Sequence, residues 1–135
     1  MDSELFEIET GDQPMVTDIT DLVRHFCTDR GDGLVSVFVP HATAGLAVIE
    51  TGAGSDDDLL KILDQLFPTH HAHWRHDHGS PGHGRDHVMP AFVSPSLTVP
   101  VIGGRLQLGT WQSITLVDPN VDNPHRSVRV SFLPG

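Results

Sequence analysis

Apolar residues recur along the chain with two different periods, which predict an alternation of helices and strands. Apolar positions that fall on one helical face predict helices over residues 20–27 and 55–67. The second begins with Ser55 and three aspartates. Negative charges are stabilising near the positive, N-terminal end of a helix dipole, and this pattern is typical of a capped helix start. Alternating or continuous apolar runs predict strands over 5–9, 34–39, 46–49, 88–93, 97–102, 105–108, 111–117 and 127–133.

Short connections between the later strands indicate antiparallel pairing. Gly103 and Gly104 suit a tight hairpin, because glycine readily adopts the positive φ of primed turns. Pro100 has no backbone N–H, so its strand should lie at a sheet edge or carry a bulge. The pattern predicts an α+β fold, an antiparallel β-sandwich with two helices, formed by a single domain over residues 1–135.

Acidic residues outnumber basic ones, which restricts the partners of the chain. Eight Lys and Arg oppose 18 Asp and Glu, for a net charge of -10 at pH 7. A nucleic-acid surface needs clustered positive charge, so we expect no nucleic-acid partner. The sequence contains no apolar run of membrane-spanning length and no signal-peptide pattern at its start, and its single cysteine cannot form an internal disulfide. We therefore expect a cytoplasmic protein without a membrane partner.

Histidines are concentrated in one stretch between the second predicted helix and the later strands. Seven of the ten histidines lie between His70 and His87. Neutral imidazole binds metals and transfers protons near pH 7, so the stretch is a candidate active loop. A solvated surface loop of biased composition explains the same residues without any function. The residues alone leave both interpretations open.

Several motifs resemble the YjbQ-type family of secondary thiamine-phosphate synthases. The motifs are His41-Ala42-Thr43-Ala44-Gly45, Ser96-Leu97-Thr98-Val99-Pro100-Val101 and Gly109-Thr110-Trp111-Gln112. Glu50 follows His41 by nine residues, and His87 follows His76 by eleven. The resemblance covers most of the chain from about residue 34 onward. It implies a small α+β homotrimer whose polar residues are grouped in a cleft, with weak thiamine-phosphate synthase activity.

The resemblance also implies a set of site residues. His41, His76 and His87 are the expected ligands of a divalent metal, for which Zn²⁺ is suited because it is commonly bound by imidazole. His83 stands where the family usually has an acidic or amide residue, and it adds a possible fourth ligand. The other implied roles are catalysis by Glu50, His41 and His87, and ligand binding by Thr43, Ser96, Thr110 and Gln112. Thr110 and Gln112 are two residues apart in the motif, so on a strand they would share a face.

The implied reaction joins a pyrimidine pyrophosphate to a thiazole phosphate with metal assistance, and the expected partner is a small phosphorylated metabolite. Two departures from the family pattern, Ile49 for asparagine and Met89 for lysine, remove groups that could orient such a substrate. One alternative is a non-catalytic protein that binds a metal or a phosphorylated metabolite. Another is a metal-dependent hydrolase of a small ester or amide, with Glu50 as general base. Histidines and a carboxylate fit all three.

Overall fold

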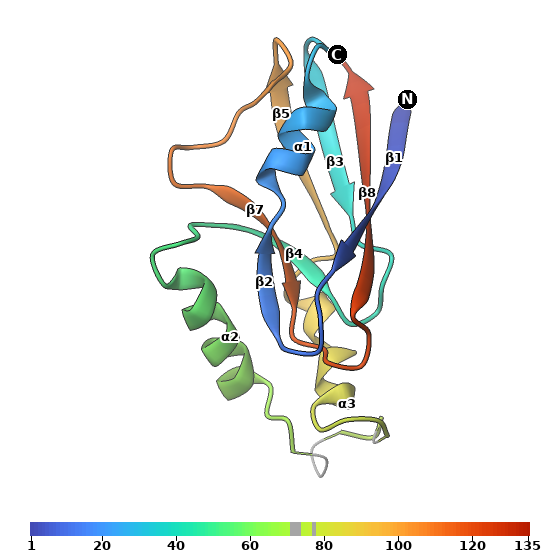
Figure 1. The fold of residues 1–135 in the computed structure, drawn as a ribbon, viewed down its shortest axis with the longest axis vertical. Coiled ribbons are helices and arrows are strands. Elements are labelled where there is room, and N and C mark those ends of the chain that lie inside the picture. Colours follow the sequence, from blue (N-terminus) through green and yellow to red (C-terminus); the bar gives the residue numbers. More distant parts are fainter. Residues whose placement is uncertain (71–73, 77) are drawn as a thin grey trace.

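Two antiparallel sheets with helices beside them form the computed structural model, which describes residues 1–70, 74–76 and 78–135 (Figure 1). The larger sheet has the strand order β1-β8-β3-β5-β6, and the smaller has the order β2-β7-β4. This arrangement confirms the predicted α+β class. The elements are β1 (Asp2–Glu9), β2 (Met15–Asp18), α1 (Thr20–Cys27), β3 (Gly33–Phe38), β4 (Gly45–Ile49), α2 (Ser55–Leu66), α3 (His83–Asp86), a 3-10 turn (Met89–Ala91), β5 (Ser96–Ile102), β6 (Arg105–Leu106), β7 (Ser113–Asp118) and β8 (His125–Pro134).

The main hydrophobic core includes residues from both sheets and from α1. Successive side chains of a strand point to opposite faces, so alternate residues of β3 and β8 are buried. Val35 and Val37 of β3 are completely buried, as is Leu116 on β7 of the other sheet. Val23 of α1 packs into the same cluster. The core explains why the long apolar runs of the sequence form strands.

A second, smaller cluster anchors the segment that follows the histidines. Leu63 of α2 packs with Met89 and with Val117 of β7, and all three are buried. Met89 begins a 3-10 turn, so the strand predicted over 88–93 is wrong. The Met89 carbonyl accepts hydrogen bonds from the N–H groups of Phe92 and Val93, and Pro90 has no N–H to offer a neighbouring strand.

Helix α2 starts where the sequence predicts, but without the predicted side-chain cap. Gly54 precedes it with φ 106°, and no side chain caps its first turn. The three aspartates do lie in that turn. Among the apolar residues of α2, Leu63 is buried, whereas Ile62 and Leu66 are exposed. None of the helices in the described residues is both long and apolar enough to cross a membrane.

The predicted hairpin and sheet edge are confirmed. Gly103 and Gly104 have φ values of 56° and 73°, and they connect β5 to β6. Strand β5 pairs with β3 from Ser96 to Val101, while on its other side β6 pairs with only Val101 and Ile102. Pro100 therefore lies next to the exposed part of this edge, where its missing N–H disrupts no strand pairing.

Candidate functional site

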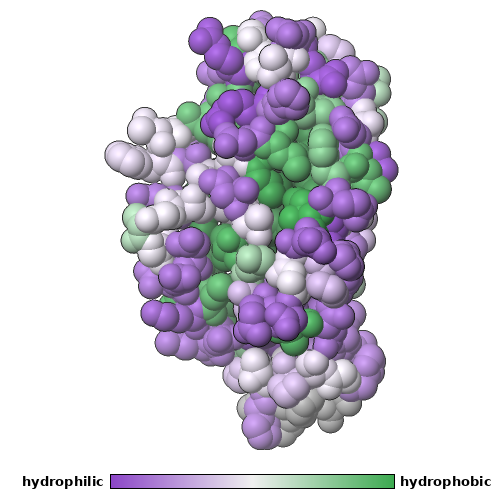
Figure 2. Space-filling view, viewed as in Figure 1, coloured by the Kyte–Doolittle hydropathy of each residue, from purple (hydrophilic) through white to green (hydrophobic). Residues whose placement is uncertain are grey.

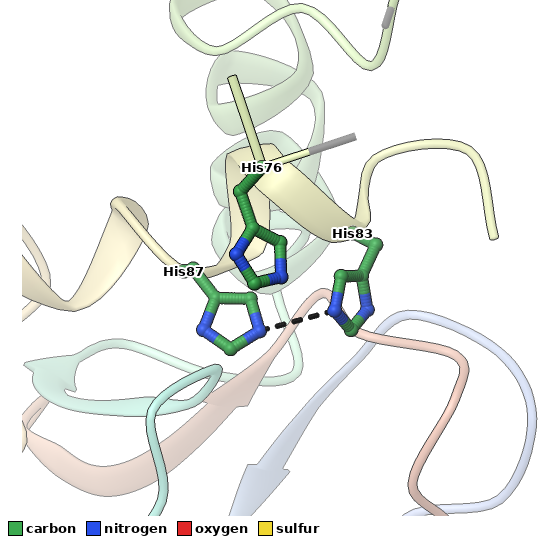
Figure 3. A group of neighbouring side chains, drawn as sticks. All are labelled: His76, His83 and His87. Carbon is green, nitrogen blue, oxygen red and sulfur yellow. Dashed lines mark hydrogen bonds between the residues drawn. The ribbon is translucent and has the colours of Figure 1, made fainter. Parts of the chain in front are cut away.

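Three histidines from the stretch between α2 and β5 bring ring nitrogens together (Figure 3). One nitrogen each from His76, His83 and His87 lies within 4.8 Å of the others. The Nε2 atoms of His83 and His87 are 3.1 Å apart. Two nitrogens bound to one tetrahedral zinc ion at 2.0–2.1 Å lie about 3.3 Å apart, so this separation fits a shared ion. It also fits a hydrogen bond from one ring to the other.

The short helix α3 places two of these histidines on one side. His83 begins the helix, and His87 follows its last residue. Residues four apart are neighbours on a helical surface, so the two rings face each other. This helix is not predictable from the apolar pattern of the sequence. Its four residues, His83–Asp86, contain no apolar residue and include Gly84, so they carry no helical apolar period.

His76 reaches the other two histidines because Gly84 allows a close approach of the backbone. A Cβ atom on Gly84 would lie 2.2 Å from the His76 carbonyl oxygen and 2.8 Å from Trp74 Cβ. The indole Nε1 of Trp74 donates a 2.7 Å hydrogen bond to the Pro68 carbonyl, which ties this segment to the end of α2. His76 is exposed and His83 is half-buried, so the group opens to solvent.

The charge states of two of these histidines suit metal ligation. Desolvation and the neighbouring imidazoles lower the pKa of His76 and the pKa of His87, which favours the neutral form that ligates metals. On the far side of His83, Asp122 Oδ2 lies 2.8 Å from Nδ1, and the Ser80 hydroxyl donates to Oδ1 of the same carboxylate. The bonds from Ser80 and His83 lower the pKa of Asp122, so this carboxylate is charged near neutral pH.

Asp122 belongs to a chain of hydrogen bonds that begins in the protein interior. Arg126 donates two hydrogen bonds to Asp118, of 2.7 and 2.9 Å, and both residues are almost completely buried. Asp118 Oδ1 accepts the N–H of Asn120 at 3.1 Å, and Asn120 Oδ1 accepts the N–H of Asp122 at 3.0 Å. Each of these side chains therefore fixes the backbone two residues further on.

Helix α3 is connected to this series of hydrogen bonds through Asp86. Asn120 Nδ2 donates to Asp86 Oδ2 at 3.1 Å, and Arg85 Nε donates to Asp86 Oδ1 at 2.7 Å. Burial raises the pKa of Asp86, and the contact with Arg85 opposes that rise. Arg85 also contacts Asp64 of α2. The helix that carries His83 is thus tied to α2 and to the segment after β7.

None of these supporting residues is among the site residues predicted from the sequence. The signal that could have shown them is the alternation of Asp118, Asn120 and Asp122. Asp and Asn at such positions accept hydrogen bonds from the backbone two residues on, so they predict an ordered turn rather than a loose loop. The contacts to Arg126 and Asp86 depend on tertiary packing, and no local pattern predicts them.

The structure does not place His41 in the three-histidine group. The Ser127 N–H donates to His41 Nε2 at 2.9 Å, which occupies that nitrogen. Burial and the nearby Arg126 lower the pKa of His41. Thr43, in the same loop, accepts a 2.8 Å hydrogen bond from Arg126 and is buried. Both residues lie next to the buried arginine that supports Asp118.

Glu50, Thr110 and Gln112 lie at the other end of β7. Glu50 follows Ile49, which pairs with Ser113 at the start of β7, whereas Asp118 ends that strand. A rise of about 3.4 Å per residue separates the two ends of the strand by roughly 17 Å. Within one chain, Glu50, Thr110 and Gln112 therefore do not lie next to the three-histidine group.

The motif around Gln112 forms a turn and not the predicted strand. Strand β7 begins at Ser113, and Gln112 Oε1 accepts the Gly109 N–H at 2.7 Å. Thr110 and Gln112 therefore do not share a strand face. Trp111 is 73% exposed. Ser96 is exposed at the start of β5, opposite Phe38 of β3.

The comparisons with known proteins agree on one family. Residues 4–135 match the family described as UPF0047 protein YjbQ-like. The chain is 60% identical over 135 residues, all of both chains, to UPF0047 protein Rv2556c of Mycobacterium tuberculosis. It is 35% identical over 112 residues to UPF0047 protein YugU of Bacillus subtilis, covering 80% of this chain and 82% of that one.

Solved structures show the same fold. Hypothetical protein APE1520 from Aeropyrum pernix K1 matches with a TM-score of 0.89 and 30% identity, covering 100% of both chains. A YbjQ-like protein of unknown function from Sulfolobus solfataricus P2, SSO2532, matches with a TM-score of 0.90 and 26% identity, covering 98% of this chain and 96% of that one. From its sequence and its fold, the chain belongs to the YjbQ-like UPF0047 family.

Proposed function

We propose that the chain binds a divalent transition-metal ion, such as Zn²⁺, through His76, His83 and His87. The observation that carries this proposal is the convergence of their three ring nitrogens within 4.8 Å. The donor set suits the ion, because catalytic zinc sites use three protein ligands and leave one position for water or substrate. The exposed side of His76 leaves room for a small molecule to approach.

We propose further that the site acts on a small phosphorylated metabolite, in a reaction of the thiamine-phosphate synthase type. The family motifs support this class of reaction, and the charges of the chain support a role for a metal. Arg85 and Arg126 are paired with Asp86 and Asp118, and the net charge is -10. A bound ion would supply the positive charge that offsets phosphate groups. The chain itself favours the neutral form of His76 and His87, whose pKa values are lowered, and helix α3 holds His83 next to them.

Metal binding is tested by titrating Co²⁺ or Zn²⁺ into metal-free protein purified without a His-tag. We expect one tight equivalent per chain, with quenching of Trp74 emission by Co²⁺, because Trp74 is two residues from His76. His76→Ala, His83→Ala and His87→Ala should each abolish the tight phase. His25→Ala, an imidazole on α1 outside the group, is the matched control and should bind normally. Equal binding by all four variants would contradict the proposed site.

The activity is tested by supplying a pyrimidine pyrophosphate and a thiazole phosphate to the metal-loaded protein. We expect slow formation of the coupled product, lost in His87→Ala. Release of pyrophosphate without coupled product would instead favour a hydrolase. Tight metal binding with neither reaction would favour the non-catalytic alternative.

A further inference from the structure

We infer that Asp122 is a positioning residue of the site: it fixes the His83 ring as the tautomer protonated at Nδ1, which leaves Nε2 as the ligand atom. Asp122 Oδ2 lies 2.8 Å from His83 Nδ1. A carboxylate only accepts hydrogen bonds, so Nδ1 must carry the proton. The remaining nitrogen, Nε2, then presents its lone pair toward His87 Nε2, 3.1 Å away.

The Asp122 carboxylate is held in place by a second contact besides His83. The Ser80 hydroxyl donates to its other oxygen. The side chains of His83 and Asp122 are only 17% and 30% exposed, which limits competition from water for their contact. A hydrogen bond to a charged carboxylate is also stronger than one between two neutral groups.

Asn120 sets the position of both partners in this contact. Its Oδ1 accepts the N–H of Asp122, and its Nδ2 donates to Asp86, which lies in the same helix as His83. One buried amide side chain therefore fixes the carboxylate on one side and the helix of the imidazole on the other. Asn120 is itself anchored by Asp118, which is completely buried.

This arrangement has a known consequence in metal sites. A carboxylate on the free nitrogen of a ligating imidazole fixes the ring orientation and raises its basicity, and removing such a partner typically costs about 10–100-fold in metal affinity. The role of Asp122 in affinity depends on the proposed metal site. Its role in fixing the tautomer does not, because it follows from the contact between Asp122 and His83 alone.

The first experiment therefore uses metal-free protein and measures the ring nitrogens of His83 by ¹H–¹⁵N NMR. We expect the Nδ1-protonated tautomer in the wild type, and a shift toward the Nε2-protonated tautomer in Asp122→Ala. Asp122→Asn retains an acceptor oxygen without the charge, so it should keep much of the wild-type tautomer. Asp57→Ala removes an exposed carboxylate at the start of α2 and should leave His83 unchanged.

The second experiment measures Co²⁺ affinity by competition with a chromophoric chelator. We expect a loss of about 10–100-fold in Asp122→Ala, a smaller loss in Asp122→Asn and none in Asp57→Ala. The inference is overturned if Asp122→Ala keeps the wild-type tautomer of His83. It is also overturned if the wild type binds Co²⁺ and Asp122→Ala binds it with the same affinity. If the wild type binds no Co²⁺ but the tautomer shifts as expected, the proposed metal function fails while the positioning of His83 by Asp122 stands.

Discussion

At His41 the imidazole accepts a hydrogen bond from the backbone, whereas at His83 it donates one to a carboxylate. The Ser127 N–H bonds to His41 Nε2, so this residue is suited to the neutral state. Nδ1 of His83 bonds to Asp122 instead, which leaves Nε2 directed toward His87. His41 and His83 therefore have different chemistry, and the difference comes from their hydrogen-bond partners.

His41 predicts a pH dependence of stability. Its pKa lies below the ordinary value of about 6.5, because of burial and Arg126. As pH falls through 6.5, the unfolded chain takes up a proton at His41 before the folded chain does. The free energy of unfolding therefore decreases as the pH decreases through this range.

The measurement compares wild type and His41→Gln by urea denaturation at pH 7.5 and pH 5.5. Glutamine retains an oxygen that can accept from Ser127 but does not titrate, so the variant should lose less stability at the lower pH. Equal losses in the two proteins would show that His41 takes up protons alike in the folded and unfolded chains.

The buried pair Arg126–Asp118 predicts a large loss of stability when one partner is removed. Arg126 is 1% exposed and Asp118 is completely buried. Arg126→Met leaves an uncompensated buried carboxylate, which should cost about 3–5 kcal/mol of unfolding free energy. Urea denaturation provides the measurement. Arg129→Met, an exposed arginine on the same strand, is the matched control and should change stability little.

The double variant Asp118→Asn with Arg126→Met separates charge from packing. Because the carboxylate charge is removed together with its partner, the double variant should recover part of the stability lost in Arg126→Met. A double variant as unstable as the single one would show that packing and hydrogen bonds around Arg126 matter more than the unpaired charge.

At the scale of elements, long segments with a clear apolar period are predictable from the sequence and short polar ones are not. Helices α1 and α2 begin where their apolar stripes predict. Helix α3 has four residues and no apolar residue, so tertiary contacts determine it. The apolar run at 88–93 forms a 3-10 turn because Met89 is buried against α2 and β7, not within a sheet.

Part of the candidate site could likewise be predicted from the sequence, and part could not. His76 and His87 follow from the family motifs. His83 is a departure from the family pattern and was expected only as a possible further ligand. Asp122 was missed, because it lies 39 residues from His83 in the sequence and only the fold brings them together. His41 was predicted as a ligand on its motif alone, and a motif does not show that a backbone N–H occupies one ring nitrogen.

The contact between α3 and the segment before it predicts the effect of Gly84→Ala. A Cβ atom 2.2 Å from the His76 carbonyl oxygen must displace one of the two segments by about 1 Å. Binding sites require ligand positions held to about 0.5 Å, so we expect Co²⁺ affinity to fall by about tenfold or more with all three histidines retained.

The control is Gly11→Ala, in the turn between β1 and β2, where a Cβ atom would meet nothing within 4 Å. Gly11 has φ 72°, so this variant carries backbone strain without disturbing the histidines. Gly84→Ala with wild-type Co²⁺ affinity would show that His76 does not need this close approach.

At the scale of the whole molecule, residues that match one family pattern lie at two ends of the same strand. The histidine group lies near the end of β7 that carries Asp118, and Glu50, Thr110 and Gln112 lie near its start. Apolar side chains gather over the sheets on one face, while the end that carries α3 is mainly hydrophilic (Figure 2). The described residues include large exposed apolar side chains, among them Trp111 at 73% and Phe92 at 70%.

We expect the chain to form a homotrimer in which neighbouring copies bring the two groups of residues together. Association would bury exposed apolar side chains, and cyclic closure leaves no unpaired interface. Light scattering at micromolar concentration should give about three times the chain mass of 14.7 kDa, and a monomer would contradict the expectation. Mixing Gln112→Ala with His87→Ala should then restore activity that each variant lacks, because a mixed trimer contains interfaces where both residues are intact. Trimers that show no restoration after subunit exchange would show that Gln112 and His87 do not form one site across a subunit interface.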